Sequence, residues 1–118
     1  MTVAGWPADL PPAGTAAFDE RVVGWLLDRG PSDLRTSDLR RYPLALARYV
    51  EAHVAAGLEA ARRTYGRLRV DLPDLQAADL GTIQRALEAQ GAHLLQAQRE
   101  VNLVAAALRA RAGAGEPT

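Results

Sequence analysis

The two histidines are the side chains of this 118-residue sequence best suited to bind a metal ion. Helical metal centres commonly place a glutamate three residues before a histidine, so that both groups project from one helix face. Here Glu51 lies two residues before His53, and Glu88 lies five residues before His93. Neither spacing brings both groups to one face. The sequence therefore predicts no metal site, and we expect both histidines at the surface or at the edge of the core.

Other catalytic patterns are missing from the sequence as well. No Glu-x-x-Glu pair that could hold Mg²⁺ occurs within an expected helix, and Asp71 and Asp74, three residues apart, lie at an expected turn. There is no cysteine, and the two serines, Ser32 and Ser37, lie where they would cap turns. No glycine-rich phosphate loop is present. The sequence thus predicts no catalytic residue and no cofactor, and it leans against an enzyme.

Arginine clusters are the remaining candidates for chemistry. Residues 35–69 carry eight arginines against three acidic residues, and arginine binds phosphate groups well. A nucleic-acid surface on one side of this segment would use Arg48, Arg62, Arg63 and Arg69. The alternative is a solvated helix face with intrahelical pairs such as Glu59–Arg63. The formal net charge of zero favours this alternative, because proteins that coat nucleic acid are usually strongly basic.

The arginines must also be judged against the composition. All 14 basic residues are arginine, and alanine is abundant, which indicates a GC-rich coding sequence such as that of a high-GC bacterium. No apolar run approaches the ~18 residues of a membrane span, and no signal-peptide pattern begins the chain. We therefore expect a cytoplasmic protein that does not bind membranes.

Apolar periodicity predicts that these residues lie on three helices in an all-α fold. The first helix covers about 15–29, with Thr15 as its N-cap and Gly30 at its C-terminal end. The second covers about 43–70, and Pro43 suits its first turn. The third covers about 75–110 and begins near Asp74 or Asp79, either of which could cap it.

The second and third expected helices should form a long antiparallel hairpin, because the loop between them is short. Facing residues should then have numbers that sum to about 150, which pairs Leu58 with Leu94 and brings Gly57 close to Gly91. The seam of the hairpin, or of a dimer, is predicted to use Leu87, Leu94, Gln98, Val101 and Leu108. Gln98 would fix the register of this seam, or alternatively line a ligand pocket.

Residues 15–111 form one helical domain in this interpretation. Residues 1–14 hold three prolines and show no periodicity, so we expect an irregular segment outside the core. Residues 112–118 are expected to form a flexible tail. Two helices of roughly 40 and 45 Å exceed the size of a compact domain of this length, and a monomer would expose a long apolar surface. Coverage of that surface by the first helix and Trp6 is the alternative to dimerisation.

The sequence therefore favours a non-enzymatic helical protein–protein interaction or scaffold module, a homodimer that forms a helical bundle. Its partner is expected to be a second copy, with another protein as the alternative. The runner-up is a nucleic-acid-associated protein that uses the arginine-rich side of residues 43–70. A small all-α enzyme with a site between two subunits comes third.

Overall fold

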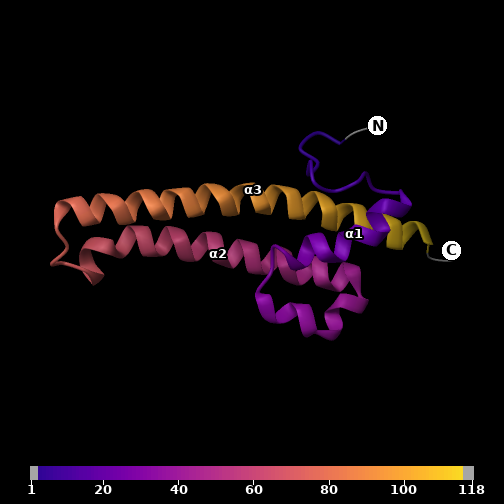
Figure 1. Ribbon diagram of the computed structural model, residues 1–118, viewed down its shortest axis with the longest axis horizontal. Coiled ribbons are helices and arrows are strands. Elements are labelled where there is room, and N and C mark those ends of the chain that lie inside the picture. The colour runs from indigo at the N-terminus through magenta and orange to yellow at the C-terminus, as the bar shows by residue number, and fades with distance from the viewer. Residues whose placement is uncertain (1–2, 116–118) are drawn as a thin grey trace.

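The computed structural model describes residues 3–115, and every regular element in this part of the chain is helical. Helix α1 spans Ala16–Leu27, α2 spans Pro43–Asp71 and α3 spans Ala77–Gly115. Two short 3₁₀ helices, η1 (Ser32–Thr36) and η2 (Asp38–Arg41), connect α1 to α2. Helices α2 and α3 form a long antiparallel hairpin, and α1 packs near the end opposite the hairpin turn (Figure 1). The predicted all-α fold with a long helix pair is confirmed.

Helix α1 begins where the sequence predicts but ends two residues earlier. The backbone N–H of Phe18 donates to the hydroxyl oxygen of Thr15 at 3.1 Å, which confirms Thr15 as the N-cap. The helix ends at Leu27. Gly30 lies past this end but does not adopt the positive φ of a left-handed C-terminal cap. Among residues 3–115, the glycines with positive φ are Gly5 and Gly14. A Cβ atom on Gly30 would lie only 2.7 Å from the Leu34 side chain. Glycine is needed there for close packing of the connector.

The hairpin helices differ from prediction mainly at the two ends of α3. Pro43 occupies the first turn of α2, as predicted. Helix α3 begins at Ala77, so neither Asp74 nor Asp79 is its cap; Asp79 lies in the first turn, where it favours the positive end of the helix dipole. At the other end α3 continues to Gly115. The tail predicted for 112–118 is thus helical as far as the structure describes it, and residues 116–118 lie outside the described residues.

The register of the hairpin agrees with the predicted pairing. A Cβ atom on Gly57 would lie 3.4 Å from the side chain of Leu94, and the Tyr65 hydroxyl donates to Glu88 at 3.1 Å. The numbers of these two pairs sum to 151 and 153, close to the expected 150. At Gly57 the added Cβ atom would make an ordinary van der Waals contact with Leu94, which does not show an unusually close approach of the two helices. At Gly91 the expectation is wrong, since a Cβ atom there would meet no described atom within 4 Å.

The main hydrophobic cluster occupies the half of the hairpin that α1 covers, and Leu58 and Leu68 are also buried farther along α2. The cluster ends at Val54 on α2 and reaches Leu94 on α3, where the side chain is half-buried. The N-terminal segment also enters this core: Pro7 and Leu10 are buried, and Trp6 packs against the core with its ring centroid 5.9 Å from that of Phe18. The expectation that residues 1–14 stay outside the core is therefore wrong.

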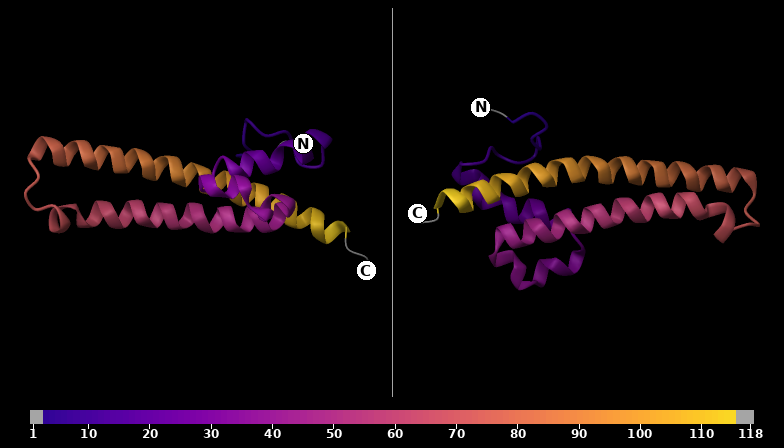
Figure 2. Two further views of the ribbon diagram at one scale, coloured as in Figure 1. Left: turned by 60° about the horizontal axis from the view of Figure 1, so that its bottom comes forward. Right: turned by 180° about the vertical axis from the view of Figure 1, so that it is seen from behind.

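The molecule is elongated, with extents of 61 × 31 × 24 Å and a radius of gyration of 17.7 Å. A compact domain of this length would have a radius of gyration of about 13.5 Å. The difference arises because the hairpin projects well beyond α1, and Figure 2 shows this projection from two further directions. We call the projecting part, residues 56–95, the distal half. In the described part of the chain, no helix combines the length and apolar character that crossing a membrane requires.

Candidate functional site

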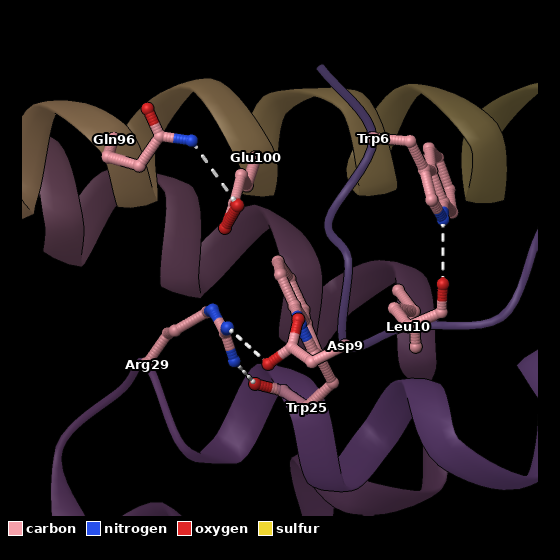
Figure 3. Close-up of polar contacts among 7 residues, drawn as sticks. All are labelled: Trp6, Asp9, Leu10, Trp25, Arg29, Gln96 and Glu100. Atoms are coloured by element: carbon pink, nitrogen blue, oxygen red, sulfur yellow. Dashed lines mark hydrogen bonds and ion pairs between the residues drawn. The ribbon is translucent and has the colours of Figure 1, made fainter. Parts of the chain in front are cut away.

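A polar cluster at the N-terminal segment forms one candidate site (Figure 3). The indole N–H of Trp25 donates to one Asp9 carboxylate oxygen at 2.8 Å, and the Arg29 guanidinium pairs with the other at 3.0 Å. Arg29 also lies over the Trp25 ring, 3.7 Å from its centroid, and donates to the Trp25 carbonyl at 2.9 Å. The Trp25 hydrogen bond, and then Arg29, lower the pKa of Asp9 below its usual value. These contacts fasten the N-terminal segment to α1.

A hollow of about 510 Å³ lies beside this cluster, and three acidic side chains line it. Its polar lining residues are Asp9, Asp28, Arg29, His93, Gln96 and Glu100. Each carboxylate has its own partner: Asp28 accepts from Arg35 at 2.7 Å, and Glu100 accepts from Gln96 at 3.4 Å. Within residues 3–115, no three His, Asp or Glu side chains are arranged to hold a metal ion. Each of the three carboxylates that line this hollow thus has a side-chain partner.

An apolar groove on the distal half is the second candidate site. It has a volume of about 340 Å³, and all the residues that line it belong to α2 or α3. We refer to it as the groove; its lining residues are Leu58, Ala61, Arg62, Tyr65, Leu87, Glu88, Gly91, Ala92 and Leu95. The Arg62 side chain from α2 and the Glu88 side chain from α3 line opposite sides. Tyr65, leucine, alanine and glycine form the rest, so the groove offers a largely apolar surface flanked by one charge of each sign.

Tyr65 links the two sides of the groove. Its hydroxyl donates to Glu88, and this hydrogen bond, together with the negative charge of Glu88, raises the pKa of Tyr65. Tyr65 is nevertheless 39% exposed, so its ring contributes apolar surface to the groove. The contact holds the Glu88 carboxylate beside the groove.

A hollow of similar size lies on the opposite face of the distal half, and we refer to it as the opposite hollow. Ala60 lines the opposite hollow, whereas Arg62 lines the groove. Because successive residues of an α-helix are turned by about 100°, the side chains of Ala60 and Arg62 leave α2 in directions about 200° apart. The opposite hollow is also lined by Arg29, from beyond the end of α1, and by the polar side chains of His53, Thr64 and Gln90. The face that carries the groove is therefore the less polar of the two.

The four arginines predicted for nucleic-acid contact do not form one uninterrupted strip. Arg48 forms an ion pair with Glu51 at 3.9 Å, while Arg62, Arg63 and Arg69 are exposed. On the helix, the direction of Glu59 lies between those of Arg62 and Arg63, because residues three and four apart share a face. The proposed Glu59–Arg63 pair is not among the ion pairs of residues 3–115.

The five predicted seam residues divide between the two halves of the hairpin. Val101 and Leu108 are buried in the core, where Val101 is fully covered. Leu87 and Leu94 lie half-buried in the distal half, and Leu87 lines both the groove and the opposite hollow. Gln98 is half-buried between the two halves.

Sequence reasoning missed the contacts made by Asp9 and the pair of Tyr65 with Glu88. Trp25 and Arg29, four residues apart on one helix face, gave a local signal for part of the first contact set. Asp9 gave none, because it lies in a proline-rich segment without periodicity. Comparison of the chain with protein-family models, with curated proteins and with solved structures finds no match.

Proposed function

We propose that this protein is a non-enzymatic helical interaction module that pairs with a second copy of itself through the distal half of its hairpin. The observation that carries the proposal is the apolar surface of this half, where Leu87 and Leu95 remain half-buried and neither α1 nor the N-terminal segment covers them. Extended apolar surfaces of this kind are uncommon in soluble monomers and mark interaction sites.

The size of the exposed surface supports the same proposal. The single chain exposes 7880 Å², whereas a compact monomer of 12.6 kDa would expose about 6,200 Å². The excess exceeds the roughly 800 Å² per partner that a standard protein–protein interface buries. The radius of gyration of 17.7 Å likewise exceeds the ~13.5 Å expected for a compact globule of this length.

Two helices from each copy would complete a four-helix core around the distal halves. Such a core is a common way to bury the apolar faces of two helical hairpins, and two-fold symmetry is the commonest arrangement of homo-oligomers. The clustered core around α1 would remain outside this bundle and keep each subunit folded.

Sedimentation velocity at micromolar concentration tests the proposal. We expect a species of twice the 12.6 kDa chain mass. The variant Leu87→Arg places a charge on the distal half, and it should shift the population to the monomer while far-UV circular dichroism stays helical. Tyr42→Arg, at an exposed aromatic residue outside the distal half, is the matched control and should leave the dimer intact. A wild-type mass of one chain would contradict the proposal.

A further inference from the structure

We propose that the second copy binds specifically on the groove, and that the two-fold axis runs parallel to the hairpin. In this arrangement α2 of each subunit lies against α3 of the other, and the two hairpin turns are at the same end. The inference rests on the proposed function. It specifies further which face of the hairpin contacts the second copy and how that copy is oriented.

The choice of face follows from the lining of the two hollows. Apart from Arg62, Tyr65 and Glu88, the groove is lined by leucine, alanine and glycine. The opposite hollow carries four polar side chains, and one of them, Arg29, already binds Asp9. Burial of polar groups without new partners opposes association, so the groove is the more favourable surface.

The small residues of α3 indicate that a helix packs closely there. Gly91 lies inside a helix, where glycine is unfavourable relative to alanine, and no described side chain fills the space that its Cβ atom would take. Packing within the chain therefore does not account for this glycine. Together with Ala61 and Ala92 it forms a low part of the groove, into which the side chains of a partner helix can fit.

The choice of axis follows from charge. The part of α2 over residues 59–71 carries four arginines and two acidic residues, whereas α3 over residues 77–95 carries two acidic residues and one arginine. A two-fold axis across the hairpin would stack α2 on α2 and bring the Arg62 side chains of both subunits together. An axis parallel to the hairpin instead places Arg62 of each subunit beside Glu88 of the other. Opposite charges across an interface select orientation in this way.

The two charges are available for such a contact. Among residues 3–115, neither Arg62 nor Glu88 takes part in an ion pair, and Tyr65 holds the Glu88 carboxylate beside the groove. The pairing would form twice in a symmetric dimer.

Charge reversal tests the pairing. Arg62→Glu and Glu88→Arg should each raise the dissociation constant of the dimer by about tenfold, and the double variant should restore it to within about threefold of wild type. Arg99→Glu, at an exposed residue outside the distal half, is the matched control and should have little effect. Two single reversals that weaken the dimer without rescue in the double variant would overturn the inference.

Spin labels test the axis independently. The chain has no cysteine, so Tyr49→Cys and Ala60→Cys each give one label per subunit on the side of α2 away from the groove. These sites lie ~16 Å apart along the helix. With the proposed axis, the label-to-label distances at the two sites should agree within about 10 Å. With an axis across the hairpin at Arg62, the distance at Tyr49 should be longer by about 15–20 Å.

The outcomes separate the inference from the proposed function. A monomeric wild-type protein would remove both. If Leu87→Arg disrupts the dimer but the label-to-label distance at Tyr49 is much longer than that at Ala60, the proposed function stands and the proposed orientation is rejected. A dimer that dissociates when Ala60 is labelled would place the interface on the opposite hollow and likewise overturn the inference.

Discussion

Asp9 is a single residue that joins the N-terminal segment to the helical core. Its carboxylate accepts from the Trp25 indole and pairs with Arg29, whose own side chain covers the Trp25 ring. Although the Asp9 side chain is largely exposed, its partners are fixed by packing in the core. The contact therefore has a defined geometry, which most exposed ion pairs lack.

We expect Asp9→Ala to lower the free energy of unfolding by about 1 kcal/mol at pH 7, because a hydrogen bond and a partly screened ion pair are lost. The pKa of Asp9 is lowered in the folded state, so this contribution is present above the ordinary value of 3.8 and disappears as the pH falls through the lowered pKa. In urea denaturation, the difference in free energy of unfolding between wild type and Asp9→Ala should thus narrow below about pH 3.8. Asp9→Asn, which can keep the Trp25 bond but cannot titrate, is the control; a gap that widens in acid would contradict this assignment.

At the scale of the helices, Gly30→Ala and Gly24→Ala are a matched pair of substitutions. A Cβ atom on Gly30 would lie 2.7 Å from Leu34 and 3.4 Å from Val50, whereas one on Gly24, inside α1, would meet nothing described within 4 Å. Gly30→Ala should therefore destabilise the protein by about 1–3 kcal/mol through overpacking. Gly24→Ala should stabilise it by about 0.5–1 kcal/mol through helix propensity. Thermal unfolding measures both changes, and equal effects in the two variants would show that packing at Gly30 is unimportant.

The elements also show how far sequence reasoning reaches. Periodicity predicts all three helices, because each carries a stripe of apolar residues at helical spacing. The stripes of α2 and α3 together predict the register of the hairpin. It fails for Pro7 and Leu10, whose burial depends on contacts with distant helices rather than on any local repeat. It also fails for the contacts of Asp9, since Trp25 lies sixteen residues away in the sequence. For the groove, the apolar stripes of the two helices supply Tyr65 and Leu87. They do not supply the hydrogen bond of Tyr65 with Glu88, because that contact requires the register of two helices at once.

The arginines of α2 lead to a prediction about nucleic acid. Arg48 is paired with Glu51, and Glu59 interrupts the cationic face between Arg62 and Arg63. We expect the affinity for duplex DNA to be no better than micromolar at physiological salt, in the non-specific range. Fluorescence anisotropy with a labelled duplex measures it. Nanomolar, sequence-dependent binding would instead make nucleic-acid recognition the leading function.

At the scale of the whole molecule, we propose that the two halves of the hairpin have different roles. The half covered by α1 and the N-terminal segment contains the core and folds the chain, and the ion pair of Arg111 with Asp19 ties α3 to α1 at its far end. The distal half adds length and apolar surface, and Leu94 at its edge packs against that core. A protein built only for its own stability would gain little from such a projection, which is why we assign the distal half to interaction.

The last prediction separates the two roles with one methyl group. In a single chain, Gly91→Ala should stabilise the hairpin by about 1 kcal/mol, because helix propensity improves and no described atom lies within 4 Å of the new Cβ. In the dimer, the same methyl group would enter the groove where the partner helix packs, so the dissociation constant should rise. Gly24→Ala on α1 is the control, since its Cβ also meets open space and it lies outside the distal half; it should stabilise the chain and leave the dimer unchanged. Thermal unfolding at high dilution measures the first effect, and sedimentation at micromolar concentration measures the second. If both variants stabilise the chain and neither weakens the dimer, the partner does not pack against Gly91.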